Sequence, residues 1–258
     1  MKPIKLFLLF GIFCACSFTA VKHKPVFYII GDSTVKNGDG KNTNILQGWG
    51  SFVDTYFDTV KISVSNQAIG GRSSRTFITE GRWDKILATL QKGDYVIMQF
   101  GHNDGGALDD TARARGTLKG TGDDSTEIYN PIRKMREVVH TYGWYMRKYV
   151  NDTKSHGAVP IVCSPIPRND WKAGKVLRSN DSYALWAREV AEQTGAFFID
   201  LNNIIGDELE KIGEQKANSF FPQEHTHTNK EGALFNVSIV IARIKQLKHC
   251  KLRKYILP

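Results

Sequence analysis

Ser33 and His227 are the residues whose types and settings suit nucleophilic catalysis. Ser33 lies in a glycine-containing turn at residues 31–34, directly after an apolar run, and His227 stands three residues after Glu224. A serine hydroxyl becomes an effective nucleophile when an imidazole takes its proton and a third group holds that imidazole in one tautomer. On a turn, a carboxylate three residues away reaches the far ring nitrogen. The spacing therefore predicts Ser33 as nucleophile, His227 as general base and Glu224 as the acid that orients the ring.

Two further segments offer hydrogen-bond donors for a developing negative charge. The stretch 66–73 contains Gly71, where the missing side chain lets a backbone N–H approach a ligand closely. The stretch 101–104 contains Asn103, whose side-chain amide donates. Hydrolysis of an ester passes through a tetrahedral oxyanion, and each donor aimed at that oxygen contributes roughly 3 kcal/mol. We expect an oxyanion hole formed by the backbone of Ser33, the backbone of Gly71 and the amide of Asn103.

Polar residues beside these segments are candidate substrate contacts. They are Arg72, His102, Asp104 and His225. An alternative is a metal-dependent hydrolase, because His225 and His227, together with His102, Asp32 and Asp104, offer nitrogen and oxygen ligands. Such an enzyme would not need Ser33. We favour the serine mechanism and expect no metal site.

Five short runs of apolar, β-branched or aromatic residues alternate with helix-like stretches. The runs are 26–30, 60–64, 95–100, 160–163 and 196–201. The helix-like stretches are 49–57, 82–90, 131–154, 181–194, 204–212 and 230–247. This alternation predicts a parallel sheet covered by helices on both faces. Because ligands gather at the carboxyl ends of parallel strands, the segments that follow these strands are expected to meet there.

Two local features stand out between the third and fourth runs. Asn130 followed by Pro131 is typical of a helix start, with asparagine as N-cap and proline at the first helical position. The preceding stretch 105–129 is polar and longer than an ordinary connection, so we expect it to be a functional loop near the site.

The first residues predict export. A basic start precedes an apolar run over residues 6–16, which is too short to span a bilayer comfortably. We expect a signal peptide over 1–17 and a single domain over 18–258. Lipidation of Cys16 is the alternative to release. The protein is therefore expected to be secreted or periplasmic, with a membrane attachment only through a lipid on Cys16.

Charge and cysteine content narrow the function classes further. The formal net charge is +9, from 35 basic and 26 acidic residues, which is compatible with an acidic polysaccharide. Export argues against a nucleic-acid partner, and no protein partner is indicated. Beyond the predicted signal peptide only Cys163 and Cys250 remain, which is not a disulfide framework, and their pairing stays open.

The segments around Ser33, Gly71, Asn103 and His227, in this order, resemble the four blocks of the SGNH (GDSL) hydrolases. Further matches resemble the rhamnogalacturonan acetylesterase branch of that family: 48–50, 68–73, 108–110, 112–117, 120–122 and 225–228. The resemblance implies an α/β, flavodoxin-like three-layer sandwich with a five-stranded parallel sheet. It also implies secretion, no cofactor, and removal of acetyl groups from pectic rhamnogalacturonan. The family has aspartate where this chain has Glu224.

Other functions remain open at this stage. An acetyl esterase acting on xylan or another glycan is a close alternative. A lipid acyl chain is a more distant substrate, because the stretch 105–129 is too polar to form an apolar lid. The changed acid at Glu224 also leaves open a non-catalytic glycan-binding relative that kept the fold.

Overall fold

The computed structural model describes residues 23–36, 38 and 44–258. The predicted signal peptide over 1–17, with the lipidation candidate Cys16, lies outside these residues, so both stay predictions. Within the described part of the chain, no helix combines the length and the apolar character that crossing a membrane requires. Cys163 and Cys250 are both buried free thiols, so they do not form a disulfide with each other.

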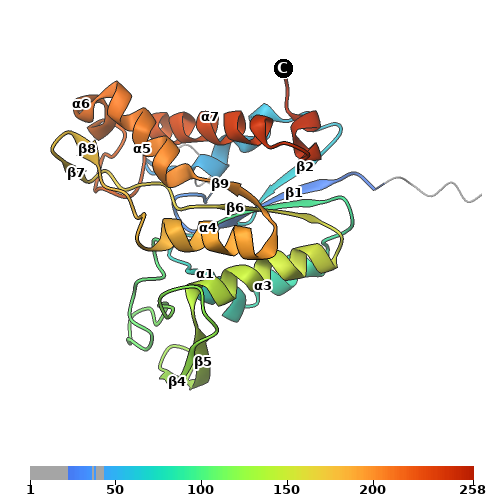
Figure 1. The fold of residues 1–258 in the computed structure, drawn as a ribbon, viewed down its shortest axis with the longest axis vertical. Helices are drawn as coiled ribbons and strands as arrows, with labels where there is room; N and C mark the ends of the chain where they lie inside the picture. The colour runs from blue at the N-terminus through green and yellow to red at the C-terminus, as the bar shows by residue number, and fades with distance from the viewer. Residues whose placement is uncertain (1–22, 37, 39–43) are drawn as a thin grey trace, which may run out of the picture.

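Five parallel strands form the central sheet (Figure 1). They are β1 (Val26–Gly31), β2 (Ser63–Asn66), β3 (Tyr95–Gln99), β6 (Val159–Cys163) and β9 (Phe197–Ile199), in the spatial order β2-β1-β3-β6-β9. This is the flavodoxin-like order, and it confirms the predicted fold class. The chain runs outward from β1 to β2 and then crosses back to β3. The carboxyl ends of β1 and β3 therefore lie side by side, where such folds bind ligands.

Helices cover both faces of the sheet (Figure 1). On one face lie α1 (Ser74–Thr79), α2 (Arg82–Leu87), α3 (Tyr142–Ser155) and α4 (Tyr183–Thr194). On the other lie the 3-10 helix η1 (Trp49–Tyr56), α5 (Leu201–Ile212), α6 (Glu214–Asn218), α7 (Lys230–Gln246) and the 3-10 helix η2 (Lys251–Tyr255).

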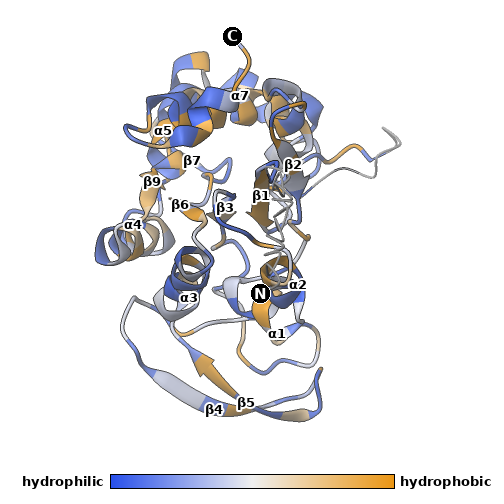
Figure 2. Cartoon of the chain, turned by 90° about the vertical axis from the view of Figure 1, so that its right-hand side faces the viewer, coloured by the Kyte–Doolittle hydropathy of each residue, from blue (hydrophilic) through white to orange (hydrophobic). Residues whose placement is uncertain are grey.

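Alternation along β1 divides the core into two layers. Phe27 and Ile29 belong to the cluster beneath η1, α5 and α7, whereas Tyr28 and Ile30 belong to the cluster beneath α1 to α4. Successive strand residues point to opposite faces, so a strand that is apolar throughout fills both layers. Figure 2 shows the strands of the sheet enclosed between the two helical layers.

The predicted helix over 131–154 is wrong in its first half. The chain forms an antiparallel hairpin of β4 (Ser125–Asn130) and β5 (Met135–His140), and only then enters α3. The side chain of Asn130 accepts hydrogen bonds from the backbone N–H groups of Ile132 and Arg133, so it closes the hairpin turn and does not cap a helix. The N-cap is Thr141, whose hydroxyl accepts from the N–H of Trp144. The hairpin extends away from the sheet, beyond α1 and α3 (Figures 1 and 2).

Other element boundaries also differ from the sequence-based expectation. The second strand begins at Ser63 because the preceding residues form a turn, in which the N–H groups of Lys61 and Ile62 donate to the carbonyl of Asp58. The stretch 49–57 forms a 3-10 helix. Four elements were not predicted from the sequence: α1, α6, η2 and a small hairpin of β7 (Trp171–Lys172) and β8 (Lys175–Val176).

A buried ion pair joins the hairpin to α1. Arg75 Nε donates to Glu137 Oε1 at 2.7 Å, and the exposed fractions of the two side chains are 0% and 6%. Arg75 Nη1 also donates to the carbonyls of Leu108 and Gly116, so one guanidinium holds both the hairpin and the stretch that precedes it. Burial alone raises the pKa of Glu137, but Arg75 and Asn130 hold it below its usual value.

We expect Glu137→Ala to lower the free energy of unfolding by about 3 to 5 kcal/mol, because it leaves the buried Arg75 charge without its carboxylate. Urea denaturation measures this loss. Glu127→Ala is the matched control on the same hairpin: its pair with Arg136 is exposed, so less than about 1 kcal/mol is expected. Equal losses in the two variants would contradict a structural role for the buried pair.

Candidate active site

Asp32 shapes the turn that presents Ser33 at the end of β1. Its buried carboxylate accepts hydrogen bonds from the backbone N–H of Thr34 at 2.9 Å and from the Thr34 hydroxyl at 2.8 Å. His102 Nδ1 lies 3.1 Å from the other carboxylate oxygen. Burial alone raises the pKa of Asp32, but the His102 ring and the Thr34 hydrogen bonds hold it below its usual value. The turn is thus braced from inside the protein.

Ser33, His227 and Glu224 lie in hydrogen-bonding contact. Ser33 Oγ is 2.6 Å from His227 Nε2, and His227 Nδ1 is 2.6 Å from Glu224 Oε1. The three side chains that the sequence analysis grouped are therefore brought together in the order that a serine–histidine–acid relay requires.

Glu224 fits the relay because its carboxylate folds back over its own turn. Besides the His227 ring, it accepts from the backbone N–H of His227 at 2.7 Å and from that of Thr226 at 2.9 Å. Burial acts to raise the pKa of Glu224, but these backbone donors keep it below its usual value. Glutamate has one methylene more than aspartate, and the turn accommodates this extra length. The carboxylate therefore stays charged and fixed beside the ring.

The predicted oxyanion donors line the same cavity as Ser33 and His227, with a volume of about 560 Å³. Gly71 has a φ of +78°, which favours glycine. The Asn103 amide donates to the carbonyl of Arg72 at 2.9 Å, which fixes its orientation against the neighbouring segment. An amide carries two N–H groups, and this bond uses one of them.

Asp104 is fully buried, so the expectation that it contacts substrate does not hold in this structure. Its Oδ1 accepts from the Ser74 N–H at 3.0 Å and from the Ser74 hydroxyl at 2.5 Å. Burial raises the pKa of Asp104 to about 7, although the Ser74 hydrogen bonds oppose the shift. The contact joins the segment after β3 to the start of α1, and so holds Asn103 against the segment that bears Gly71.

We expect Asp104→Asn to flatten the pH dependence of stability. A carboxyl group whose pKa rises from 3.8 to about 7 on folding contributes stability at low pH, which is lost as pH climbs through this interval. The asparagine variant does not titrate. Urea unfolding of both proteins at several pH values from about 4 to about 8 measures the two slopes. Parallel curves would show that Asp104 does not titrate in this way.

Arg72, His102 and His225 occupy different surroundings. Arg72 lines the Ser33 cavity and pairs with Glu80 at 3.0 Å. His102 is nearly buried, with its Nε2 3.0 Å from the carbonyl of Ile166. His225 is half-exposed and bonds to Asp170 at 2.7 Å. Of the predicted contacts, only Arg72 thus shares the cavity of the relay.

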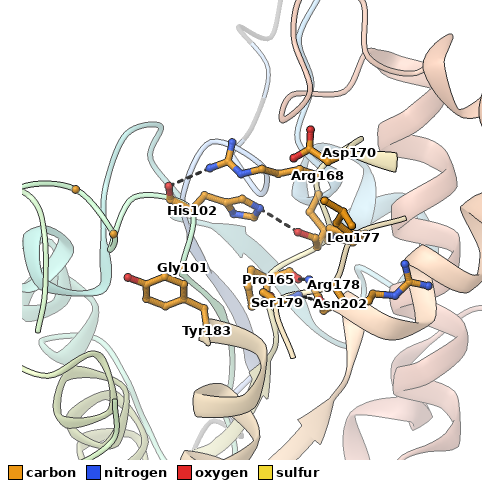
Figure 3. Close-up of a pocket in the computed structure, with 14 residues that line it drawn as sticks. Gly101, His102, Pro165, Arg168, Asp170, Leu177, Arg178, Ser179, Tyr183 and Asn202 are labelled. Carbon is orange, nitrogen blue, oxygen red and sulfur yellow. Dashed lines mark hydrogen bonds between the residues drawn. The ribbon is translucent and has the colours of Figure 1, made fainter. Parts of the chain in front are cut away.

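His102 faces a second cavity of about 470 Å³ (Figure 3). Arg168, Asp170 and Tyr183 also line it. Arg168 donates to the His102 carbonyl and to the Thr226 hydroxyl, so it connects the segment after β3 with the segment that carries His227.

The metal-site alternative has no matching cluster in the described ranges, where no three His, Cys, Asp or Glu side chains converge to hold an ion. His225 and His227 have separate partners: Asp170 for the first, and Ser33 with Glu224 for the second. Their H-x-H spacing therefore does not bring the two rings to one point.

Several residues that line the Ser33 cavity were not predicted from the sequence. They include Lys36, Arg113, Arg115 and Ile132. Arg113 and Arg115 belong to the polar stretch after β3, and Ile132 comes from the tip of the β4–β5 hairpin. The polar, charged character of that stretch was the available signal, but nothing in the sequence indicated which of its side chains reach the cavity.

Comparison with known proteins agrees with this geometry. A rhamnogalacturonan acetylesterase from Emericella nidulans is 35% identical over 207 residues, which cover 80% of this chain and 79% of that protein. A probable rhamnogalacturonan acetylesterase from Bacillus subtilis, YesY, is 30% identical over 226 residues, or 85% of this chain and 92% of that protein. The crystal structure of YxiM from Bacillus subtilis shares the fold with a TM-score of 0.71 at 23% identity, and the match covers 88% of this chain and 58% of YxiM. The family model of the GDSL-like lipases and acylhydrolases matches residues 29–234. The chain belongs to the GDSL-like lipase/acylhydrolase family and is a carboxylic ester hydrolase.

Proposed function

We propose that this protein is an exported serine esterase that removes O-acetyl groups from a plant cell-wall polysaccharide, rhamnogalacturonan first among the candidates. The observation that carries the proposal is the relay of Ser33, His227 and Glu224, with both contacts at 2.6 Å, in an open cavity that also holds Gly71 and Asn103. Two relatives that bear the name rhamnogalacturonan acetylesterase support the acetylated glycan as substrate.

The relay performs ester hydrolysis in two displacements. His227 takes the proton of Ser33 as the serine oxygen attacks the acetyl carbonyl. The oxyanion accepts hydrogen bonds from the backbone of Ser33, the backbone of Gly71 and the amide of Asn103. Collapse of this intermediate transfers the proton from His227 to the departing sugar hydroxyl and leaves acetyl-Ser33. Water then attacks the acetyl group with His227 as base again. The bond to Ser33 Oγ breaks, His227 returns the proton to that oxygen, and acetate departs. Glu224 stabilises the imidazolium in both halves.

The cavity lining supports a small acyl group on a polar substrate. Among the lining residues that the structure describes, the apolar ones apart from glycine are Ala112 and Ile132, and the others are polar or charged. A long acyl chain would find little apolar surface to cover it, and burial of apolar surface is what binds such chains. This composition favours acetylated glycans over lipids.

The test is a substrate panel with the mature protein: acetylated rhamnogalacturonan, acetylated xylan and a palmitoyl ester. We expect fastest acetate release from rhamnogalacturonan and little turnover of the palmitoyl ester. Faster release from xylan would favour the acetylxylan alternative. Preference for the palmitoyl ester, or specific glycan binding with no deacetylation, would contradict the proposal.

Export is part of the proposal and rests on the sequence of residues 1–17. Expression of the full chain, followed by fractionation and N-terminal analysis, tests it. We expect a secreted or periplasmic product that begins at residue 18. A product that retains residue 1 in the cytoplasm would contradict export, and a lipid-modified Cys16 would show anchoring instead of release.

A further inference from the structure

The cavity around Ser33 carries positive charge that the relay does not use. Among the residues that the structure describes, four cationic ones line it: Lys36, Arg72, Arg113 and Arg115. The acidic residue among the described lining residues is Glu80, which pairs with Arg72 at 3.0 Å and with Arg82 at 2.6 Å. Within residues 23–36, 38 and 44–258, neither Arg113 nor Arg115 has a carboxylate within ion-pair distance. The cavity is therefore built to receive negative charge.

A strained turn places Arg113 and Arg115 there. The Asp110 carboxylate accepts hydrogen bonds from three successive backbone N–H groups, those of Ala112, Arg113 and Ala114. Ala114, between the two arginines, is buried with a φ of 41°, in the left-handed region that L-residues rarely adopt. Backbone strain of this kind persists where surrounding contacts enforce it and is concentrated at functional sites. Here it turns the chain so that side chains on both sides of Ala114 line one cavity.

Arg115 is held directly beside the oxyanion residue Gly71. Its Nη1 donates to the Gly71 carbonyl at 3.2 Å. A guanidinium has five N–H groups in a planar fork, and this backbone contact uses one of them. Within the described part of the chain, this is the one hydrogen bond of the Arg115 side chain, so the rest of the fork remains for a ligand.

The two arginines also oppose each other electrostatically. Burial and then the neighbouring Arg113 lower the pKa of Arg115, and the charges of Asp104, Asp110 and Asp32 offset this only in part. Like charges held close together destabilise the charged form, and an anion that bridges them removes this repulsion. A carboxylate matches the planar guanidinium fork and forms two parallel hydrogen bonds with it.

We propose that Arg113 and Arg115 bind the carboxylate of a uronate in the substrate, on the acetylated sugar or on its neighbour, and so select acidic over neutral acetylated glycans. Arg115 lies beside the oxyanion residue Gly71, so a carboxylate bound to Arg115 lies close to the acetyl ester that reacts. The inference rests on the proposed deacetylation of glycans and names the residues that determine its specificity.

The experiment compares three acetylated oligosaccharides of equal length: one that contains galacturonate, the same one with its carboxylates methyl-esterified, and a neutral xylo-oligosaccharide. Wild type, Arg113→Gln, Arg115→Gln and the double variant are assayed on each by acetate release. Arg243→Gln, in the last turn of α7, removes the same charge away from the cavity and serves as the control.

We expect the wild type and Arg243→Gln to prefer the free carboxylate over its methyl ester. Each cavity variant is expected to lose about tenfold to a hundredfold of kcat/KM on the acidic substrate, the scale of a hydrogen bond to a charged group, with much smaller losses on the neutral ones. The double variant should show little preference for the free carboxylate over its methyl ester, and the loss on the acidic substrate should lie mainly in KM. Equal losses on all three substrates, or a wild type without preference, would overturn the carboxylate site and leave the esterase standing. Hydrolysis of p-nitrophenyl acetate without release from any glycan would overturn both proposals.

Discussion

Ser33→Ala is expected to lower kcat/KM for acetate release about a thousandfold or more, the scale of losing a triad member. The Ser33 hydroxyl contacts His227 at 2.6 Å and is the nucleophile of the proposed mechanism, so no acetyl-enzyme forms without it. Activity is measured on p-nitrophenyl acetate and on acetylated rhamnogalacturonan. Ser238→Ala, on the exposed side of α7, is the control and should keep full activity, because among the described residues its hydroxyl bonds only to the Phe235 carbonyl of its own helix.

The combination with His227→Ala sharpens this prediction. Groups that act as one unit are not additive, so the double variant should be about as inactive as either single variant. If the activity loss of the double variant equalled the product of the two single losses, this would contradict a shared relay. Thermal unfolding of each variant shows whether the fold is retained, since neither side chain belongs to the apolar core.

Glu224→Ala is expected to lower kcat by about a hundredfold to ten-thousandfold, because the imidazole loses its orienting charge. The pKa of Glu224 lies below its usual value, so the carboxylate is charged throughout the neutral and mildly acidic range. The loss should therefore be similar at both ends of that range. Glu224→Gln keeps the shape and removes the charge, and should lose nearly as much. Glu208→Ala, on the surface of α5, is the charge-matched control.

Glu224→Asp tests whether the length of the acid matters. Aspartate is shorter by one carbon–carbon bond, about 1.5 Å, and the Glu224 carboxylate reaches the ring and two backbone N–H groups at once. We expect the kcat of the aspartate variant to lie between that of the wild type and that of Glu224→Ala. Unchanged turnover in both Glu224→Asp and Glu224→Ala would show that another group orients His227.

The relay and the sheet were predictable for the same reason. Ser33 and Asn103 follow apolar runs directly, and runs of that kind form parallel strands whose carboxyl ends meet. His227 and Glu224 are close in sequence, so their contact needs only a turn. The strand order β2-β1-β3 then brings the segments after β1 and β3 together, as the resemblance to the SGNH hydrolases implied.

The wrong predictions concern segments whose local structure is determined by contacts with residues far away in the sequence. Asn130 and Pro131 carry a helix-start pattern, but Arg75, more than fifty residues earlier, binds Glu137 and fixes this stretch as a hairpin. Asp104 was predicted as a substrate contact, yet it is buried against Ser74 at the start of α1, a helix that the sequence pattern did not reveal. Arg113 and Arg115 flank Ala114, whose left-handed backbone conformation cannot be predicted from amino-acid preferences. Their place in the cavity was therefore not predictable.

The most direct test of the account is the mass of the enzyme during turnover. The protein is mixed with excess p-nitrophenyl acetate, quenched in acid within the first turnovers, digested and analysed by mass spectrometry, with Ser33→Ala and a chelator-treated sample alongside. We predict one added acetyl group on the peptide that contains Ser33, present with or without chelator and absent from Ser33→Ala. Acetate release by Ser33→Ala at the wild-type rate, or an acetyl group found only elsewhere on the chain, would contradict Ser33 as the nucleophile.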